Sequence, residues 1–209
     1  MNSVDKRYIR GEATYRQIIE AATDIISEQG VSGLTASKLS ERSKISKSSV
    51  FHHFSSTQEI PFAVLKAIME NMIQPFEKAE KKVTLEAYLL DLGKALCYMI
   101  EEQRRVYKVF FAFYHESIYN EVLKNMLSEF LESTKDDLKH IFLDSWMVKA
   151  SNFISEMSRE EREKEAEKLS YLLITTLDGM GLHLLMGEPA DTYMHSWQLQ
   201  INLLRRYFI

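Results

Sequence analysis

The sequence predicts an all-α fold in two parts, and three observations lead to this prediction. The chain has 209 residues, of which 45% are hydrophobic, and this is ample for a packed core. Its seven Gly and three Pro are few, and long segments rich in Val and Thr are missing. Apolar residues recur three and four positions apart along most of the chain, as on the buried face of a helix. We expect a small domain at residues 1–56 and a larger helical domain at residues 57–209.

Three short helical patterns lie between Tyr15 and Ile60. The first spans residues 17–26, with isoleucines and alanines on one face, and Gly30 ends it. Patterns at 34–42 and 46–54 follow, and only a tight turn separates them. Two short helices joined so closely cross at a steep angle, which leaves the later one free to enter a groove of DNA. The arrangement is a helix-turn-helix, whose small core we expect to hold Leu39, Ile45, Val50 and Phe54.

These residues resemble the tetracycline-repressor (TetR) family of bacterial transcription regulators. The similarity is carried by Gly30 with Leu34 and Thr35, by the turn at 43–46, and by the run 50–54 followed by Glu59 and Ile60. In the family, a Thr at the place of Thr35 caps the second helix and touches phosphate. Residues around Lys47 meet base edges and backbone, and a His at the place of His53 approaches phosphate. The resemblance therefore implies a set of DNA contacts: Thr35, Ala36, Lys44, Ser46, Lys47, Ser48, Ser49, Phe51, His52 and His53.

Three positions depart from the family pattern. Lys44 stands where a Gly is usual, so it must tolerate a left-handed backbone at a cost of roughly 1 kcal/mol. Phe51 replaces a Tyr and lacks the hydroxyl that contacts phosphate, and Thr57 replaces a Lys and removes a positive charge. These losses leave an alternative open, in which the chain is a helical small-molecule-binding protein that no longer binds a specific operator.

The rest of the sequence predicts a series of longer helices. The capping-box pattern Ser56-x-x-Glu59 indicates a fourth helix that runs to about Lys78, with a kink or a delayed start at Pro61. A second capping box, Ser158-x-x-Glu161, opens a later helix. We expect the remaining helices at residues 85–101, 104–114, 118–146, 158–186 and 191–208.

The last two predicted helices carry apolar faces that are wider than one small domain readily covers. The resemblance implies that these helices pair with their copies in a four-helix interface, so we expect a homodimer with Leu184 and Trp197 in that interface. The alternative is that both faces are buried within one chain. Two symmetric copies would read a palindromic operator in double-stranded DNA, with half-sites about 34–36 Å apart or more.

Aromatic and sulfur-containing side chains cluster between Cys97 and His115, and others lie on later helices. Helical bundles hold small apolar ligands between helices and orient them with a few polar groups. Because the family binds effectors in its larger domain, we expect a small, mostly apolar effector here. The alternative for each residue is ordinary core packing. The candidate ligand-binding residues are Met99, Tyr107, Phe110, Phe111, Tyr114, Trp146, Met180 and His183.

The net charge of −4 is unevenly distributed along the chain. Residues 1–56 hold eight Lys and Arg against six Asp and Glu, a net charge of +2, which leaves −6 for residues 57–209. The basic excess therefore lies in the predicted DNA-binding domain, where it supports a modest, salt-sensitive affinity for phosphates. A basic N-terminal arm of Lys6, Arg7, Arg10 and Arg16 is part of it.

Other classes of function find little support in the sequence. Paired Glu-x-x-His motifs, a nucleophile elbow and a Gly-rich phosphate loop are absent, and Cys97 is the sole cysteine. We therefore expect no metal, no cofactor and no enzymatic activity, with a bundle enzyme as a third alternative. No signal peptide is visible, and the apolar segment 171–187 is interrupted by Asp178 and His183, so we expect a cytoplasmic protein outside the membrane. The leading hypothesis is a ligand-responsive transcriptional regulator, most simply a repressor that its effector releases from DNA.

Overall fold

The computed structural model describes residues 3–77 and 84–207, and all regular structure in these residues is helical. The chain divides into two compact units. Unit 1 takes the described residues up to Met72 together with Arg105–Asn125, and unit 2 takes the described residues of Ile73–Arg104 and Met126–Ile209. The all-α fold class is confirmed, and the division at residue 56 stays a prediction.

Unit 1 contains the predicted helix-turn-helix. Its helices are α1 (Ser3–Gln29), a 3₁₀ turn at Val31–Gly33, α2 (Ala36–Ser43), α3 (Lys47–His53), the first part of α4 (Ile60–Glu77) and most of α6 (Arg104–Ser117). Leu39, Val50 and Phe54 are buried beneath α2 and α3, as predicted, while Ile45 is half-buried. The core of this unit also holds four residues on one face of α1: Ile18, Ala22, Ile25 and Ile26.

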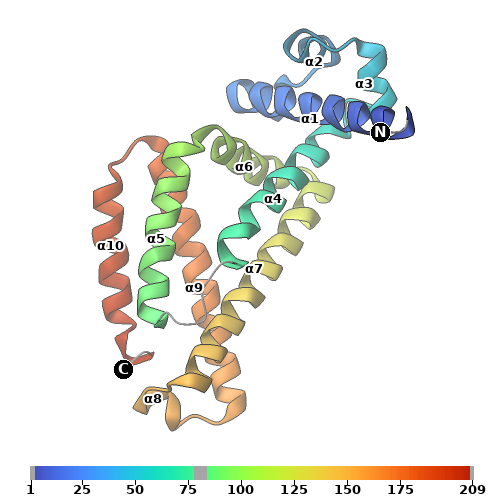
Figure 1. The fold of residues 1–209 in the computed structure, drawn as a ribbon. Coiled ribbons are helices and arrows are strands. Elements are labelled where there is room, and N and C mark those ends of the chain that lie inside the picture. Colours follow the sequence, from blue (N-terminus) through green and yellow to red (C-terminus); the bar gives the residue numbers. More distant parts are fainter. Residues whose placement is uncertain (1–2, 78–83, 208–209) are drawn as a thin grey trace. The chain divides into compact units, whose positions relative to one another are not determined.

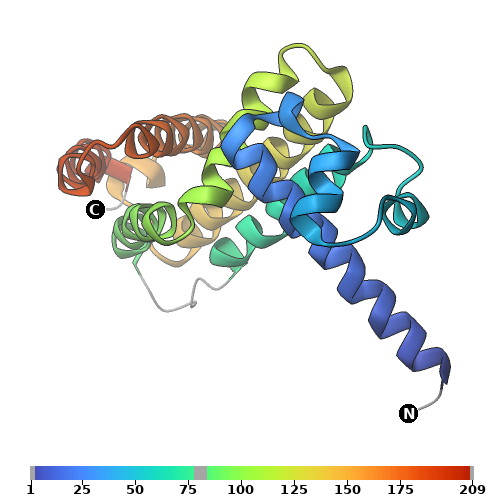
Figure 2. The ribbon, with the colours of Figure 1, turned by 90° about the horizontal axis from the view of Figure 1, so that it is seen from above.

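Helix α1 is much longer than the sequence pattern indicated. The prediction covered residues 17–26, whereas α1 begins at Ser3, and Figure 2 shows it as one continuous helix. The earlier turns lack the repeated apolar face on which the prediction relied, although nothing in them forbids a helix. The predicted end is confirmed, because Gly30 follows α1. Its φ is 73°, a value that residues with a side chain rarely adopt.

Helix α4 begins later than its predicted capping box. The Glu59 carboxylate accepts a hydrogen bond from the backbone N–H of Ser55 at 2.9 Å, so it does not reach back to Ser56. The helix starts at Ile60, with Pro61 in its first turn, where a missing N–H costs nothing. The delayed start at Pro61 is confirmed and the Ser56 capping box is wrong. The predicted end near Lys78 lies outside the described residues.

Unit 2 is built on α5 (Leu85–Glu102), which packs against both α9 (Arg159–Met186) and α10 (Ala190–Leu203), as Figure 1 shows. The later part of α7 (Glu121–Val148) adds Leu138, Phe142 and Trp146 to the same core. The Ser158 capping box at the start of α9 is confirmed. Cys97 lies buried on α5, and burial raises the pKa of its thiol.

Trp197 and Leu184 are core residues of a single chain, which corrects their predicted place in a dimer interface. The Trp197 side chain is fully buried, and its Nε1–H donates to the Leu89 carbonyl at 2.7 Å. Leu184 is 4% exposed. Both α9 and α10 carry apolar residues on more than one side. The sequence pattern did not indicate which side packs into the core of the same chain.

The C-terminal segment is anchored where α7 ends. Helix α10 stops at Leu203, and a 3₁₀ turn at Arg205–Tyr207 follows, so the predicted helix to Phe208 is too long. The Trp146 indole N–H donates to the Tyr207 carbonyl at 3.0 Å, and the Tyr207 hydroxyl donates to Glu165 at 2.7 Å. The short helix α8 (Asn152–Ser155) lies in the same region.

By length and composition, α9 is the one described helix that is apolar enough to cross a membrane. Of its most apolar stretch, 39% is already buried inside the protein. The core helix of a soluble protein has the same character, so this feature is weak evidence for a membrane span.

Candidate nucleic-acid interface

The turn between α2 and α3 is shaped by caps on both helices. Thr35 precedes α2, and its hydroxyl accepts a hydrogen bond from the N–H of Lys38 at 3.3 Å. Lys44 follows α2 in the left-handed region, with a φ of 56°, as its position in the turn predicts. Ser46 then precedes α3, and its hydroxyl accepts from the N–H of Ser49 at 3.2 Å. The Thr35 and Ser46 caps fix where α2 and α3 begin, and each is worth about 1 kcal/mol.

Lys47 is held on the surface by a neighbour on α2. Its Nζ donates to the Ser37 hydroxyl at 2.8 Å, and its side chain is exposed. A lysine in the first turn of an exposed helix that donates to a surface hydroxyl exchanges that hydroxyl readily for a phosphate or a base edge. The geometry fits a DNA contact.

The far end of α3 carries aromatic and imidazole rings. The His53 ring lies 6.3 Å from the Tyr15 ring of α1, and Tyr15 stacks on Phe54 at 5.5 Å, so His53 is supported from beneath. Phe51 is 47% exposed and presents an apolar ring to solvent at the position where the family has a tyrosine. Such a ring suits contact with a thymine methyl group rather than with phosphate.

None of the ten predicted DNA-contacting residues is buried. Ala36, Ser49 and His53 are half-buried, and the others are exposed. They belong to one short stretch of chain that includes the start of α2, the turn and α3. The structure therefore leaves this set accessible, and the role of each residue in binding DNA stays a prediction.

A cluster of ion pairs lies beside this interface and was not predicted from the sequence. Arg42 at the end of α2 forms two hydrogen bonds with the Glu28 carboxylate, at 2.9 and 2.7 Å. This pair lowers the pKa of Glu28. Arg105 on α6 pairs with Glu20 at 2.6 Å and also with Asp24, and the second oxygen of Asp24 lies 3.8 Å from Arg42. The partners are far apart in sequence, so no local pattern could have revealed the cluster.

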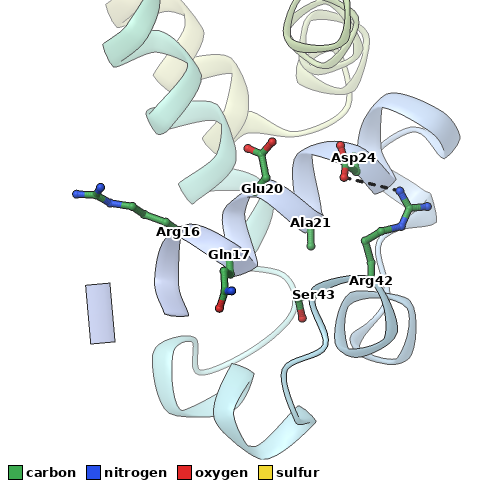
Figure 3. Close-up of a pocket in the computed structure, with 7 residues that line it drawn as sticks. All are labelled: Arg16, Gln17, Glu20, Ala21, Asp24, Arg42 and Ser43. Atoms are coloured by element: carbon green, nitrogen blue, oxygen red, sulfur yellow. Dashed lines mark ion pairs between the residues drawn. The ribbon is translucent and has the colours of Figure 1, made fainter. Parts of the chain in front are cut away.

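An open hollow of about 430 Å³ lies beside the same ion pairs. Figure 3 shows its lining, to which α1 and the end of α2 contribute Arg16, Gln17, Glu20, Ala21, Asp24, Arg42 and Ser43. The lining is charged or polar apart from Ala21, and its arginines pair with carboxylates. Such a surface does not suit the mostly apolar effector that the sequence predicts.

Four of the eight predicted ligand-binding residues lie together on α6. The Phe110 ring is 5.9 Å from the Phe111 ring and 5.1 Å from the Tyr114 ring, and the last two rings are 5.6 Å apart. Phe111 and Tyr114 are half-buried, whereas Phe110 and Tyr107 are buried. Burial raises the pKa of Tyr107 to about 12. Three rings of the predicted aromatic cluster therefore meet, within unit 1.

The other four predicted residues, which belong to unit 2, do not meet at one place. Trp146 stacks with Tyr207, beyond the end of α10, whereas His183 lies beside Tyr193, in the first turn of α10. Helix α10 has 14 residues, so these two places are on the order of 20 Å apart. Met180 is buried and Met99 is half-buried. The ligand-binding role of these residues stays a prediction.

Comparison with known proteins decides what kind of protein presents this interface. Residues 18–64 match the model of a family described as bacterial regulatory proteins, tetR family. These residues form a tetR-family DNA-binding domain. The match includes α2, α3 and the start of α4, so the protein is a DNA-binding transcription regulator with a helix-turn-helix.

Similar proteins extend over most of the chain. The HTH-type transcriptional regulator BetI of Escherichia coli K12 is 26% identical over 196 residues, which cover 93% of this chain and 91% of BetI. A transcriptional regulator from Rhodococcus sp. Rha1 has a TM-score of 0.75 at 20% identity, covering 93% of this chain and 97% of its own. A putative regulator from Saccharomonospora viridis, solved in complex with choline, has a TM-score of 0.75 at 16% identity, covering 91% and 96%. These structures show that the fold is shared over both units.

Proposed function

We propose that this tetR-family chain is a ligand-responsive repressor. It binds a palindromic operator as a homodimer in the cytoplasm and leaves the operator when a small effector binds. The observation that supports DNA reading most directly is the first turn of α3, where Ser46, Lys47 and Ser48 are all exposed on a helix whose start is fixed by caps. Polar side chains at this end of a recognition helix reach base edges in the major groove.

An exposed apolar surface on α9 and α10 supports the homodimer. On α9, Leu182 and Met186 are 46% and 72% exposed, and on α10, Leu199 and Leu203 are 60% and 72% exposed. Each pair is spaced four residues apart, so each forms a stripe along its helix. Gly179 adds an open position to α9, since a methyl group there would meet nothing within 4 Å. Pairing of these stripes with their copies would remove the apolar surface from water and place two reading helices on one operator.

The aromatic cluster on α6 supports an effector with apolar groups. Phe111 and Tyr114 are half-buried and retain accessible ring surface. Aromatic faces attract organic cations as well as apolar groups. Because the similar Saccharomonospora viridis regulator was solved in complex with choline, a quaternary ammonium compound is the first effector class to test.

Release from DNA would follow from a shift between two states of the dimer. The effector favours the state in which the two reading helices no longer match the half-site spacing. Linkage requires that effector and operator weaken each other's binding by the same factor. A ligand that binds the protein and leaves operator affinity unchanged would contradict this function.

Selection of genomic DNA fragments by the purified protein, followed by footprinting, tests the proposal. A repressor of this kind selects a few fragments that share a palindrome, and its footprint covers both half-sites. The alternative, a helical binding protein without an operator, selects no sequence above background. Adding choline to the footprinted complex then shows whether a quaternary ammonium releases the DNA.

A further inference from the structure

Two successive arginines, Arg104 and Arg105, bind to different helices. The chain passes from unit 2 to unit 1 between Arg104 and Arg105. In unit 2, the Arg104 guanidinium donates to the carbonyls of Leu184, at 3.3 Å, and Leu185, in the last turn of α9. A cation at this end of a helix also interacts favourably with the helix dipole. In unit 1, Arg105 pairs with Glu20 and Asp24 of α1. One peptide bond therefore joins the residue that caps α9 to the residue that holds α1.

The ion pairs of Arg105 continue to the turn that precedes α3. Asp24 divides its carboxylate between two arginines, with Oδ1 on Arg105 and Oδ2 at 3.8 Å from Arg42 Nη1. Figure 3 shows the link between Asp24 and Arg42. Arg42 lies in the last turn of α2, two residues before Lys44. The path Arg105–Asp24–Arg42 thus ends at the turn that sets the direction of α3.

The ion pairs are worth more as a positioning device than as a source of stability. The side chains of Arg105, Asp24 and Arg42 are 38%, 30% and 38% exposed, and ion pairs with such access to water contribute little to folding. However, the Arg42–Glu28 pair is bidentate and the Asp24 carboxylate has two arginine partners. Such pairs fix geometry in addition to energy.

We propose that Arg105 is a positioning residue for DNA reading, which acts through Asp24 and Arg42 on the turn before α3. Arg105 does not touch DNA. Because it follows Arg104 directly, a change in the conformation of the α5–α6 junction alters its pairing with Asp24, and the turn before α3 responds. This inference rests on the proposed function and adds to it a route by which the junction affects operator affinity.

The test compares Arg105→Gln with a matched control, Arg159→Gln. Arg159 is a 93% exposed arginine whose partner is Glu163 on the same helix of unit 2. We expect Arg105→Gln to weaken binding to the selected operator between about 2-fold and 30-fold, the range of coupling through residues that contact no ligand. Arg105→Lys, which keeps the charge but not the fork, should have a smaller effect. Arg159→Gln should leave affinity unchanged, and equal effects of Arg105→Gln and Arg159→Gln would overturn the proposal.

A double-mutant cycle shows whether the effect passes through Asp24. Arg105→Gln added to Asp24→Asn should cost little beyond Asp24→Asn alone, because both changes break one path. Arg105→Gln added to Lys47→Ala should multiply the two losses, because Lys47 is proposed to touch DNA directly. Losses that multiply in the first cycle would contradict a path through Asp24. A merely structural role would lower the unfolding temperature in parallel with the affinity, so thermal unfolding is followed for every variant.

Hydrogen exchange without DNA separates this inference from the proposed function. We expect the backbone N–H groups of residues 43–47 to exchange faster in Arg105→Gln than in the wild-type protein or in Arg159→Gln. Unchanged exchange in a folded Arg105→Gln protein would overturn the role of Arg105. If the wild-type protein selects no DNA, the proposed function fails, while the exchange experiment still decides whether Arg105 positions the turn. Should Arg105→Gln not fold, Arg105→Lys takes its place in this measurement.

Discussion

The indole ring of Trp197 lies directly against Gly93, and a methyl group on Gly93 would overlap ring atoms Cδ1 and Nε1. The ring has no room to withdraw, because it is fully buried and its N–H is bonded to the Leu89 carbonyl. Gly93 is therefore the residue that lets α10 approach α5. The contact holds the last helix of the chain on the core of unit 2.

Gly93→Ala should destabilise the protein. Overpacking a fixed core typically costs 1–3 kcal/mol, against a gain of about 1 kcal/mol for replacing Gly by Ala in a helix. Because Trp197 cannot move without losing its hydrogen bond, we expect a net loss in urea unfolding. Gly11→Ala is the control, since a methyl group there meets nothing within 4 Å. A Gly93→Ala protein as stable as the wild type would show that Trp197 repacks freely.

Leu199→Arg should convert the proposed dimer to a folded monomer. Leu199 is 60% exposed in the single chain, so an arginine there disturbs the chain itself very little. In a dimer the same arginine would be an unpaired buried charge, which costs several kcal/mol. Light scattering measures the mass, and Val148→Arg, at an 89% exposed position at the end of α7, is the control. A stable Leu199→Arg dimer would place the interface elsewhere.

Lys47→Ala should weaken binding to the selected operator by about 1–3 kcal/mol if Lys47 meets a base. Its loss should then depend on the base pair that it faces, which operator variants reveal in a binding assay. A loss that is equal for all DNA sequences would instead indicate a phosphate contact. Lys94→Ala, which removes an exposed charge from α5, controls for net charge. Full affinity in Lys47→Ala would rule out α3 as the reading helix.

Glu28 should titrate at a lower pH in the wild-type protein than in Arg42→Gln. The hydrogen bonds from Arg42 lower the pKa of Glu28 in the folded state. A lowered folded pKa means that the stabilisation is present above the unfolded pKa and is lost as pH falls through the folded value. Carboxylate chemical shifts from NMR follow this titration directly. Identical titration curves in the two proteins would mean that the pair does not persist in solution.

Phe111→Ala should impair the response to effector more than it impairs DNA binding. Phe111 is half-buried beside Phe110 and Tyr114, so its loss opens the aromatic cluster, at a cost below the roughly 3–5 kcal/mol of a fully buried ring. Titration of choline into the operator complex measures the response, and unfolding in urea is measured beside it. A folded variant with an unchanged response would place the effector elsewhere.

The features that the sequence predicted correctly depend on residues that are close together in the chain. The cap at Thr35 and the left-handed backbone at Lys44 depend on neighbours within a few residues, and the structure has both as expected. The rings of α6 meet because residues one, three and four apart on a helix are neighbours.

Contacts between helices that are distant in sequence could not be predicted from the spacing of residues. The sequence showed that α10 is apolar on several sides, but not that Trp197 faces α5 while Leu199 faces outward. Trp146 and His183 were predicted to join one cluster, yet they lie near opposite ends of α10. Both outcomes depend on how helices distant in sequence pack, which residue spacing does not encode.

The burial of Cys97 gives this protein a practical advantage for spectroscopy. A thiol that is buried and has a raised pKa is largely protonated and reacts slowly with maleimide or methanethiosulfonate reagents. Because Cys97 is the sole cysteine, a second one introduced at an exposed position such as Ser48 can be labelled selectively while the native residue is kept. Pairs of spin labels at that position in a dimer would report the separation of the two α3 helices, with and without choline, in a protein whose core is unaltered.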